Sequence, residues 1–154
     1  MSVYLVQHGK NLPKEQDPEQ ALSPEGKSGV QAVAGQMRKM GPTLSLIEHS
    51  PKLRAKQTAE IFRDMLGGDV QSRERSGIKA LDDPRPVAEE LDSRKDVMLV
   101  GHLPFMSKLA SCLVFNEPEK PVVQFENGGV LCLDRDVESG MWLIKWTLYP
   151  SLLV

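Results

Sequence analysis

The segment VYLVQHG, at residues 3–9, carries the strongest structural signal in the chain. Its four leading apolar residues form a continuous run, which is typical of a strand buried on both faces in a parallel sheet. The run ends in Gln7 and His8, and at Gly9 the missing side chain lets a ligand come close to the backbone. Ligands of open α/β sheets bind beyond the carboxyl ends of the strands. We therefore expect His8 to lie at a ligand-binding edge.

Strand-like and helix-like segments alternate along the rest of the chain. The predicted strands are residues 3–7, 44–49, 77–81, 97–100, 129–133 and 141–148. The predicted helices begin at Ser23-Pro24 and Ser50-Pro51 and cover residues 85–94 and 104–115. This order predicts a single α/β domain over residues 1–154, with a mostly parallel sheet and helices on both of its faces. The closing hairpin is expected to add antiparallel strands at one edge.

Two local patterns near the C-terminal end carry further predictions. Residues 127–129, Asn-Gly-Gly, are typical of a turn before a strand, and they could also bring backbone N–H groups to a ligand. The even spacing of Trp142 and Trp146 predicts that both lie on one face of the last strand, in the core.

Composition narrows the class of protein. With 40% hydrophobic and 26% charged residues, the 154-residue chain fits an ordinary globular domain, and a formal net charge of −2 gives no indication of a nucleic-acid or anionic-membrane partner. No apolar run approaches the roughly 20 residues that span a bilayer, and the first strand starts too early for a signal peptide. Cys112 and Cys132 lack metal-ligand spacing, which favours reduced core thiols. We expect a cytoplasmic protein.

The chain has three histidines, and each directly follows a predicted strand. They are His8, His49 and His102, so all three should lie near one edge of the sheet. The second Ser-Pro pair adds a helix start at that edge, with free backbone N–H groups and a partial positive charge. Arg54 falls in the first turn of that helix. A helix start combined with an arginine is well suited to binding a phosphate group.

These residue types suit the transfer of a phosphoryl group. A neutral imidazole can attack phosphorus and carry the group covalently. The other side chains must then stabilise charge on its oxygens, which Arg54 can do through its guanidinium and a cationic His102 through a second donor. The histidines show no HxH or HxxxH spacing and no acidic fourth ligand is evident, so neither a metal nor another cofactor is expected.

Three motifs resemble the histidine phosphatase superfamily. They are QHG at residues 7–9, SPKLRAKQTA at residues 50–59 and GHLP at residues 101–104. The short chain and the segment ALSPEG at residues 21–26 are similar to the SixA branch of protein phosphohistidine phosphatases. The resemblance, which extends from residue 3 to about residue 115, implies a phosphoglycerate mutase-like α/β/α sandwich. It also implies that His8 is the phosphorylated nucleophile, that Arg54 clamps the phosphate, and that His102 is the second pocket histidine.

The chain departs from this pattern at one position. Gln7 stands where the superfamily's Arg-His-Gly triplet has arginine, and the loss of one charge-assisted contact costs about 1.5–3 kcal/mol. Lys10 is a candidate to restore the charge. Larger members carry an acid for the leaving group on an insertion; Asp82 and Asp83 lie in the corresponding region, although a turn and helix cap explain them better. His49 matches no catalytic position and is interpreted as a pocket-rim or structural residue.

The favoured hypothesis is a metal-independent phosphohistidine phosphatase. Its expected partner is a phosphohistidine-bearing protein, such as a signalling phosphotransfer domain or a carrier, and the enzyme is expected to be a monomer. A compact chain without a lid suits a protein surface better than a small metabolite. Two alternatives stay open: a small-molecule phosphomonoesterase, and a degenerate module that binds phosphate or a phosphoprotein without turnover because of Gln7.

Overall fold

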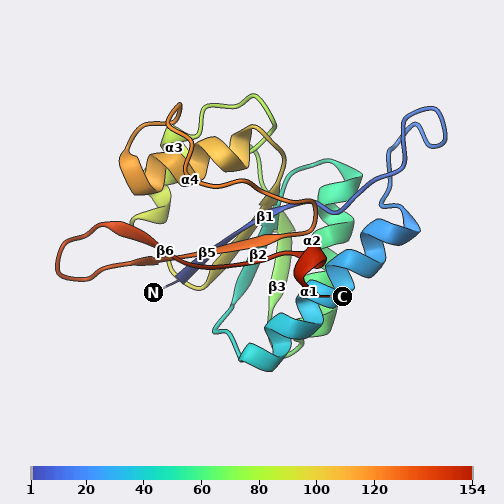
Figure 1. Cartoon of the computed structure of the whole chain (residues 1–154), viewed down its shortest axis with the longest axis horizontal. Helices are drawn as coiled ribbons and strands as arrows, with labels where there is room; N and C mark the ends of the chain where they lie inside the picture. The colour runs from blue at the N-terminus through green and yellow to red at the C-terminus, as the bar shows by residue number, and fades with distance from the viewer. Residues whose placement is uncertain (1, 154) are drawn as a thin grey trace.

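A computed structural model of the chain describes residues 2–153. Six strands form one mixed sheet in the order β3-β2-β4-β1-β5-β6 (Figure 1). The strands are β1 (Ser2–Gln7), β2 (Leu46–His49), β3 (Gln71–Glu74), β4 (Val97–Gly101), β5 (Val130–Arg135) and β6 (Trp142–Leu148). The helices are α1 (Pro24–Met40), α2 (Leu53–Leu66), α3 (Arg85–Leu91) and α4 (Phe105–Phe115), followed by the short 3-10 helix η1 (Pro150–Leu152).

Strand direction divides the sheet into two parts. β1, β4, β2 and β3 run parallel to one another, whereas β5 is antiparallel to β1 and β6 is antiparallel to β5. The predicted mixed sheet, with an antiparallel hairpin at one edge, is confirmed. Because β1, β4 and β2 are parallel neighbours, their carboxyl ends meet at one edge of the sheet.

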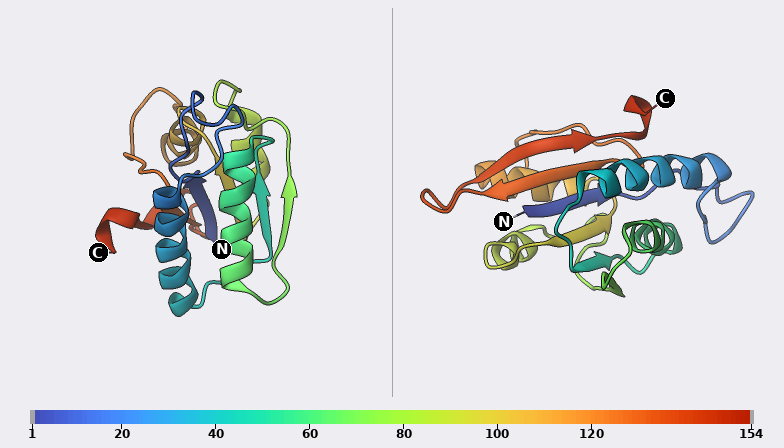
Figure 2. Two further views of the ribbon diagram at one scale, coloured as in Figure 1. Left: turned by 90° about the vertical axis from the view of Figure 1, so that its right-hand side faces the viewer. Right: turned by 90° about the horizontal axis from the view of Figure 1, so that it is seen from below.

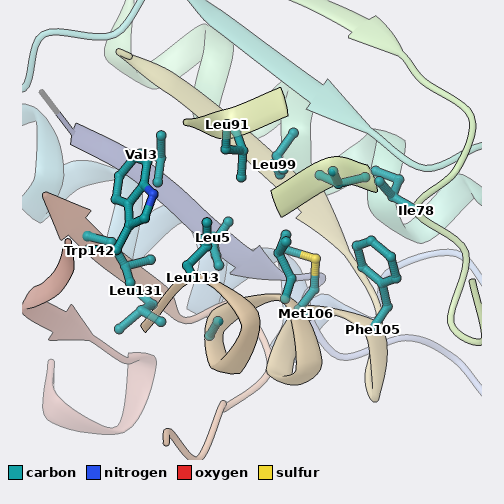
Figure 3. Packing of buried hydrophobic residues seen from close by; sticks show 14 of the residues in the cluster. Val3, Leu5, Ile78, Leu91, Leu99, Phe105, Met106, Leu113, Leu131 and Trp142 are labelled. Carbon is teal, nitrogen blue, oxygen red and sulfur yellow. The ribbon is translucent and has the colours of Figure 1, made fainter. Parts of the chain in front are cut away.

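Helices cover both faces of the sheet, so the fold has three layers. Alternate strand residues point to opposite faces, which divides the core into two clusters. Figure 2 shows α1 and α2 side by side, and the cluster beneath them includes Tyr4, Val6, Val30, Val33, Ile47, Phe62 and Met98. The cluster beneath α3 and α4 includes Val3, Leu5, Leu91, Leu99, Phe105, Met106, Leu131 and Trp142 (Figure 3). Among the helices of residues 2–153, none combines the length and apolar character that crossing a membrane requires.

The two Ser-Pro pairs behave differently. Ser23 caps α1 as predicted, because its Oγ accepts the Gly26 N–H at 2.9 Å. Ser50 does not cap α2, which begins two residues beyond Pro51 at Leu53. The prediction that Ser50-Pro51 opens the helix is therefore wrong, since the Ser50 hydroxyl has another partner, His102, at the end of β4.

The predicted edge strand at residues 77–81 is also wrong. The edge strand is β3, whose sequence QSRE is entirely polar. An edge strand pairs on one side only and is largely exposed here, so it carries no apolar pattern. Residues 77–81 instead form bends next to Gly77 (φ +83°), and Ile78 is buried as a single apolar anchor (Figure 3).

A β-bulge places the two tryptophans on opposite faces of the sheet. Cys132 pairs with Trp146 but the next residue, Leu133, pairs with Ile144, so β6 contains one extra residue. Trp142 consequently joins the cluster beneath α3 and α4, whereas Trp146 packs against Tyr4 on the α1 and α2 side. The prediction of one shared face is wrong, because a bulge reverses the alternation and leaves no local sequence signal.

The remaining boundaries agree with the prediction to within a few residues. α3 ends at Leu91 rather than at residue 94, α4 begins one residue later than predicted, and β5 extends to Arg135. Cys112 and Cys132 are buried and unpaired.

One buried carboxylate organises a charged network on β2. Glu48 is 3% exposed and accepts hydrogen bonds from Arg73 at 2.9 Å and Arg94 at 2.7 Å, with Arg75 at 3.4 Å. Arg75 and Arg94 also contact Glu90 of α3. These arginines hold the pKa of the Glu48 carboxyl below its ordinary value, although burial alone would raise it. The network joins β2, β3 and α3 around one charge.

We predict that Glu48→Gln lowers the free energy of unfolding by roughly 3 kcal/mol, because it removes the buried charge that pairs with the half-buried Arg75 and Arg94. Glu90 is 43% exposed, so Glu90→Gln should cost less than about 1 kcal/mol. Urea unfolding of both variants measures the two values. Equal losses would contradict a central role for Glu48.

Candidate active site

The functional residues meet where the parallel strands end. The His8 N–H donates to Gly101 O at 3.0 Å, and the Ser50 N–H donates to Val100 O at 3.1 Å. This ladder brings His8, at the end of β1, beside His102, at the end of β4. The two ring centroids lie 5.0 Å apart. The structure thus brings together the two histidines that the sequence places after separate strands.

The ring of His8 is held in one tautomer. Its Nδ1 lies 2.7 Å from Gly9 O, and a carbonyl oxygen can only accept, so Nδ1 carries the proton. The lone pair is therefore on Nε2. Burial, followed by the nearby charge of Arg54, lowers the pKa of His8 below its ordinary value. At neutral pH the ring is uncharged, with Nε2 in the form a nucleophile requires.

The surroundings of His102 disfavour the protonated, positively charged form of its ring. Its Nε2 lies 2.5 Å from the Oγ of Ser50, which is fully buried. Burial, and then electrostatic interactions with His8, Arg54 and Lys52, lower the pKa of His102 to about 4. This is contrary to the expected cationic His102, because the ring is buried near the charge of Arg54 and no carboxylate among the described residues offsets that charge.

Arg54 is the cation of the site. It lies in the first turn of α2, half-buried, and its charge lowers the pKa of both His8 and His102. Within residues 2–153 no carboxylate or hydrogen bond offsets the burial that lowers the pKa of Arg54 itself. A half-buried guanidinium without a partner is chemically suited to binding an anion.

The end of the SPKLRAKQTA motif secures the loop after His8. Thr58 Oγ1 accepts the Gly9 N–H at 3.0 Å and donates to Arg54 O, and Gln57 Oε1 accepts the Leu22 N–H at 2.8 Å. A side chain at Gly9 would lie 2.7 Å from a methyl group of Val30, so the close approach requires glycine. The roles of Thr58 and Gln57 were not predicted from the sequence, although both residues lie in the SPKLRAKQTA motif.

The turn at residues 127–129 supports the same segment. The Gly128 N–H donates to Gln7 O at 2.9 Å, and Asn127 Nδ2 donates to His8 O at 3.1 Å. These groups face the main chain of β1. The amide oxygen of Gln7 itself is buried and has no hydrogen-bond partner among the described residues. Gln7 therefore carries a polar group that the fold does not use.

Lys10, the candidate to restore the missing positive charge, pairs with a residue outside the pocket. Lys10 is exposed and its Nζ lies 2.8 Å from Glu25, so its charge is already neutralised and does not replace an arginine at position 7. Lys52, which the sequence analysis did not single out, is the lysine whose charge reaches His102. His49 is buried with Nδ1 2.9 Å from Ser50 O, a structural contact.

The two candidate acids form the turn before α3. Asp82 accepts the Lys79 N–H at 2.8 Å and Asp83 accepts the Arg85 N–H at 3.1 Å. Asp82 is half-buried and Asp83 is exposed, and neither has a polar contact with His8, His102 or Arg54 within the described part of the chain. The helix-cap position is Pro84, so Asp83 supports the first turn from one residue before the cap.

Comparison with known proteins agrees with this geometry. The model of the histidine phosphatase superfamily (branch 1) matches residues 3–77. The resemblance to the histidine phosphatase superfamily is confirmed. The match includes His8 and Arg54 but ends before His102. A search of curated proteins finds no match.

Several solved phosphatase structures share the whole fold. The protein histidine phosphatase SixA, solved with tungstate, superposes with a TM-score of 0.86 at 23% identity over 100% of both chains. Phosphoserine phosphatase from Entamoeba histolytica has a TM-score of 0.70 at 16% identity over 99% of both chains. Mycobacterial glucosyl-3-phosphoglycerate phosphatase has a TM-score of 0.70 at 16% identity, over 94% of this chain and 97% of its own. The predicted phosphoglycerate mutase-like fold is confirmed.

The lowered pKa of His102 predicts a pH dependence of stability. In the unfolded chain the ring takes up a proton near its ordinary pKa of about 6.5, whereas the folded ring does so only near pH 4. The unfolded state therefore binds more protons between these values, and lowering the pH from 7 to 4.5 should destabilise the fold by about 2 kcal/mol through His102. Urea unfolding at both pH values, with His102→Asn as the reference, measures this contribution. Identical pH dependence in the two proteins would contradict it.

Proposed function

We propose that the chain is a phosphatase that removes the phosphoryl group from a phosphohistidine on another protein, without a metal ion. The observation that carries the proposal is the unpartnered guanidinium of Arg54 near the neutral ring of His8, whose Nε2 has a free lone pair. A phosphoryl group supplies both the anion that Arg54 lacks and an electrophile for Nε2. The SixA structure with tungstate, a tetrahedral oxyanion, supports this choice.

The proposed reaction has two steps. First, the lone pair of His8 Nε2 forms a bond to phosphorus while the P–N bond to the substrate imidazole breaks. A proton on the other nitrogen of that imidazole lets it leave as a neutral molecule. Water then attacks phosphorus, the bond to His8 breaks, and phosphate is released with the proton going to phosphate or solvent. Arg54 holds the non-bridging oxygens throughout, through paired N–H donors.

The substrate class follows from the leaving group. An alcohol leaves as an alkoxide and needs a general acid, whereas an imidazole leaves more readily from a labile phosphoramidate. Asp82 and Asp83 are engaged in a turn, and no other carboxylate contacts the site residues in the described chain. These observations favour phosphohistidine over a phosphomonoester. A protein substrate fits the short connection at residues 75–84, which adds no lid.

We predict that phosphate becomes trapped on His8. Incubation with a radiolabelled phosphohistidine protein should give an acid-labile, alkali-stable label on the enzyme, which His8→Ala abolishes. Arg54→Ala should slow labelling about 100-fold, because it removes the donors to the phosphoryl oxygens. Arg63→Ala, on the same helix and paired with Asp64, is the matched control and should label normally.

The same assay separates the alternatives. Turnover of sugar phosphates by a wide margin over phosphohistidine protein would favour the small-molecule phosphomonoesterase. Phosphate binding with neither label nor hydrolysis would contradict an enzyme and favour the binding module that Gln7 suggests.

Substitutions at Gln7 test whether an added positive charge in the pocket raises the rate of dephosphorylation. Gln7→Arg should raise the rate about tenfold or more, because a charge-assisted contact to the phosphoryl group is worth about 1.5–3 kcal/mol. Gln7→Met keeps the side-chain length without charge or hydrogen bonding and should not raise it. Single-turnover dephosphorylation measures both. An unchanged or lower rate in Gln7→Arg would show that the pocket is built around glutamine.

A further inference from the structure

We propose that Ser50 is a positioning residue that fixes His102 as its Nδ1–H tautomer, so that an uncharged His102 still offers an N–H to the phosphoryl group. The inference rests on the proposed phosphatase function and deepens it, because it assigns the direction of a proton in the site. It also gives the Ser50-Pro51 pair a role other than starting α2.

The direction of the hydrogen bond follows from the surroundings of Ser50. Its Oγ is fully buried and has two contacts: His102 Nε2 at 2.5 Å and the Lys52 N–H at 3.4 Å. The Lys52 N–H can only donate, so the hydroxyl proton of Ser50 has a single acceptor among the described residues, His102 Nε2. With Nε2 accepting, the proton of a neutral His102 must lie on Nδ1.

In this tautomer, His102 can donate a hydrogen bond to a phosphoryl oxygen without carrying a positive charge. A phosphoryl oxygen needs a donor, yet burial and the nearby charge of Arg54 keep the ring of His102 uncharged at neutral pH. Nδ1 has no hydrogen-bond partner among the described residues, so its proton is available to an oxygen of the substrate. The opposite tautomer would present a lone pair to an anion and repel it.

Local structure holds Ser50 in place. Its N–H donates to Val100 O, and Pro51 follows, which has no N–H and restricts the conformation of the residue before it. α2 begins only at Leu53, so the hydroxyl is not used as a helix cap. Ser50 therefore reaches His102 from the end of the adjacent parallel strand.

The test combines NMR with kinetics. In ¹⁵N-histidine-labelled wild type at pH 7, long-range ¹H–¹⁵N spectra should show His102 as the Nδ1–H tautomer. Ser50→Ala should shift the ring toward Nε2–H and lower the rate of phosphohistidine turnover about tenfold, the worth of one hydrogen bond. Ser50→Thr, which keeps the hydroxyl, should restore the tautomer. Ser45→Ala, an exposed serine before β2, is the control and should change neither readout.

Two results would overturn the proposal: an Nε2–H or doubly protonated His102 in wild type, or a Ser50→Ala protein with an unchanged tautomer. The wild-type spectrum alone decides the first, even if Ser50→Ala fails to fold. Loss of the proposed function is distinguishable, because a wild type that shows the Nδ1–H tautomer but no turnover contradicts the phosphatase and leaves the assignment of the proton intact.

Discussion

The register between β1 and β4 is the constraint on which the site depends. Gln7 lies opposite Gly101 in the parallel ladder, so the residues that follow each strand, His8 and His102, are neighbours although 94 positions separate them in sequence. β2 pairs with the other side of β4 and brings Ser50 to the same place. A slip of one residue in either pairing would turn the side chains to the opposite face. The two buried clusters oppose such a slip, since each strand residue belongs to a defined face.

Near the carboxyl end of β2, arginine side chains occur in two different electrostatic environments. Around Glu48, each of three arginines pairs with at least one of two carboxylates, which makes the network part of the fold. Around Ser50, the guanidinium of Arg54 has no carboxylate partner among the described residues, and burial lowers its pKa. Burial, and then the nearby charge of Arg54, also lower the pKa of His8 and His102. A protein retains such an uncompensated group where a ligand supplies the missing charge. This contrast is the physical basis for separating a structural cluster from a candidate active site.

Features encoded in local patterns could be predicted from the sequence, and features that depend on distant partners could not. Apolar runs identified the central strands, and Ser23 identified the start of α1, because neighbours in the chain determine both. β3 was not predicted, because an exposed edge strand needs no apolar residue. Trp146 was predicted on the wrong face, because the β-bulge depends on how β6 pairs with β5. In the site, the residues His8, Arg54 and His102 were predicted, but the partner of Ser50 and the pairing of Lys10 with Glu25 required the structure.

The charge of the pocket bears on the substrate. With Gln7 in place of arginine and an uncharged His102, Arg54 is the one fixed charge that faces both histidines within the described chain, and Lys52 adds a weaker influence from an exposed position. A phosphomonoester develops negative charge on its leaving oxygen as well as on the phosphoryl group, and both need stabilisation. A phosphohistidine protonated on its second nitrogen releases a neutral imidazole, so the charge to be stabilised stays on the phosphoryl oxygens, near Arg54. A pocket that is poor in cations is therefore better matched to a phosphoramidate than to a phosphate ester, which connects the departure at Gln7 to the class of substrate proposed for this site.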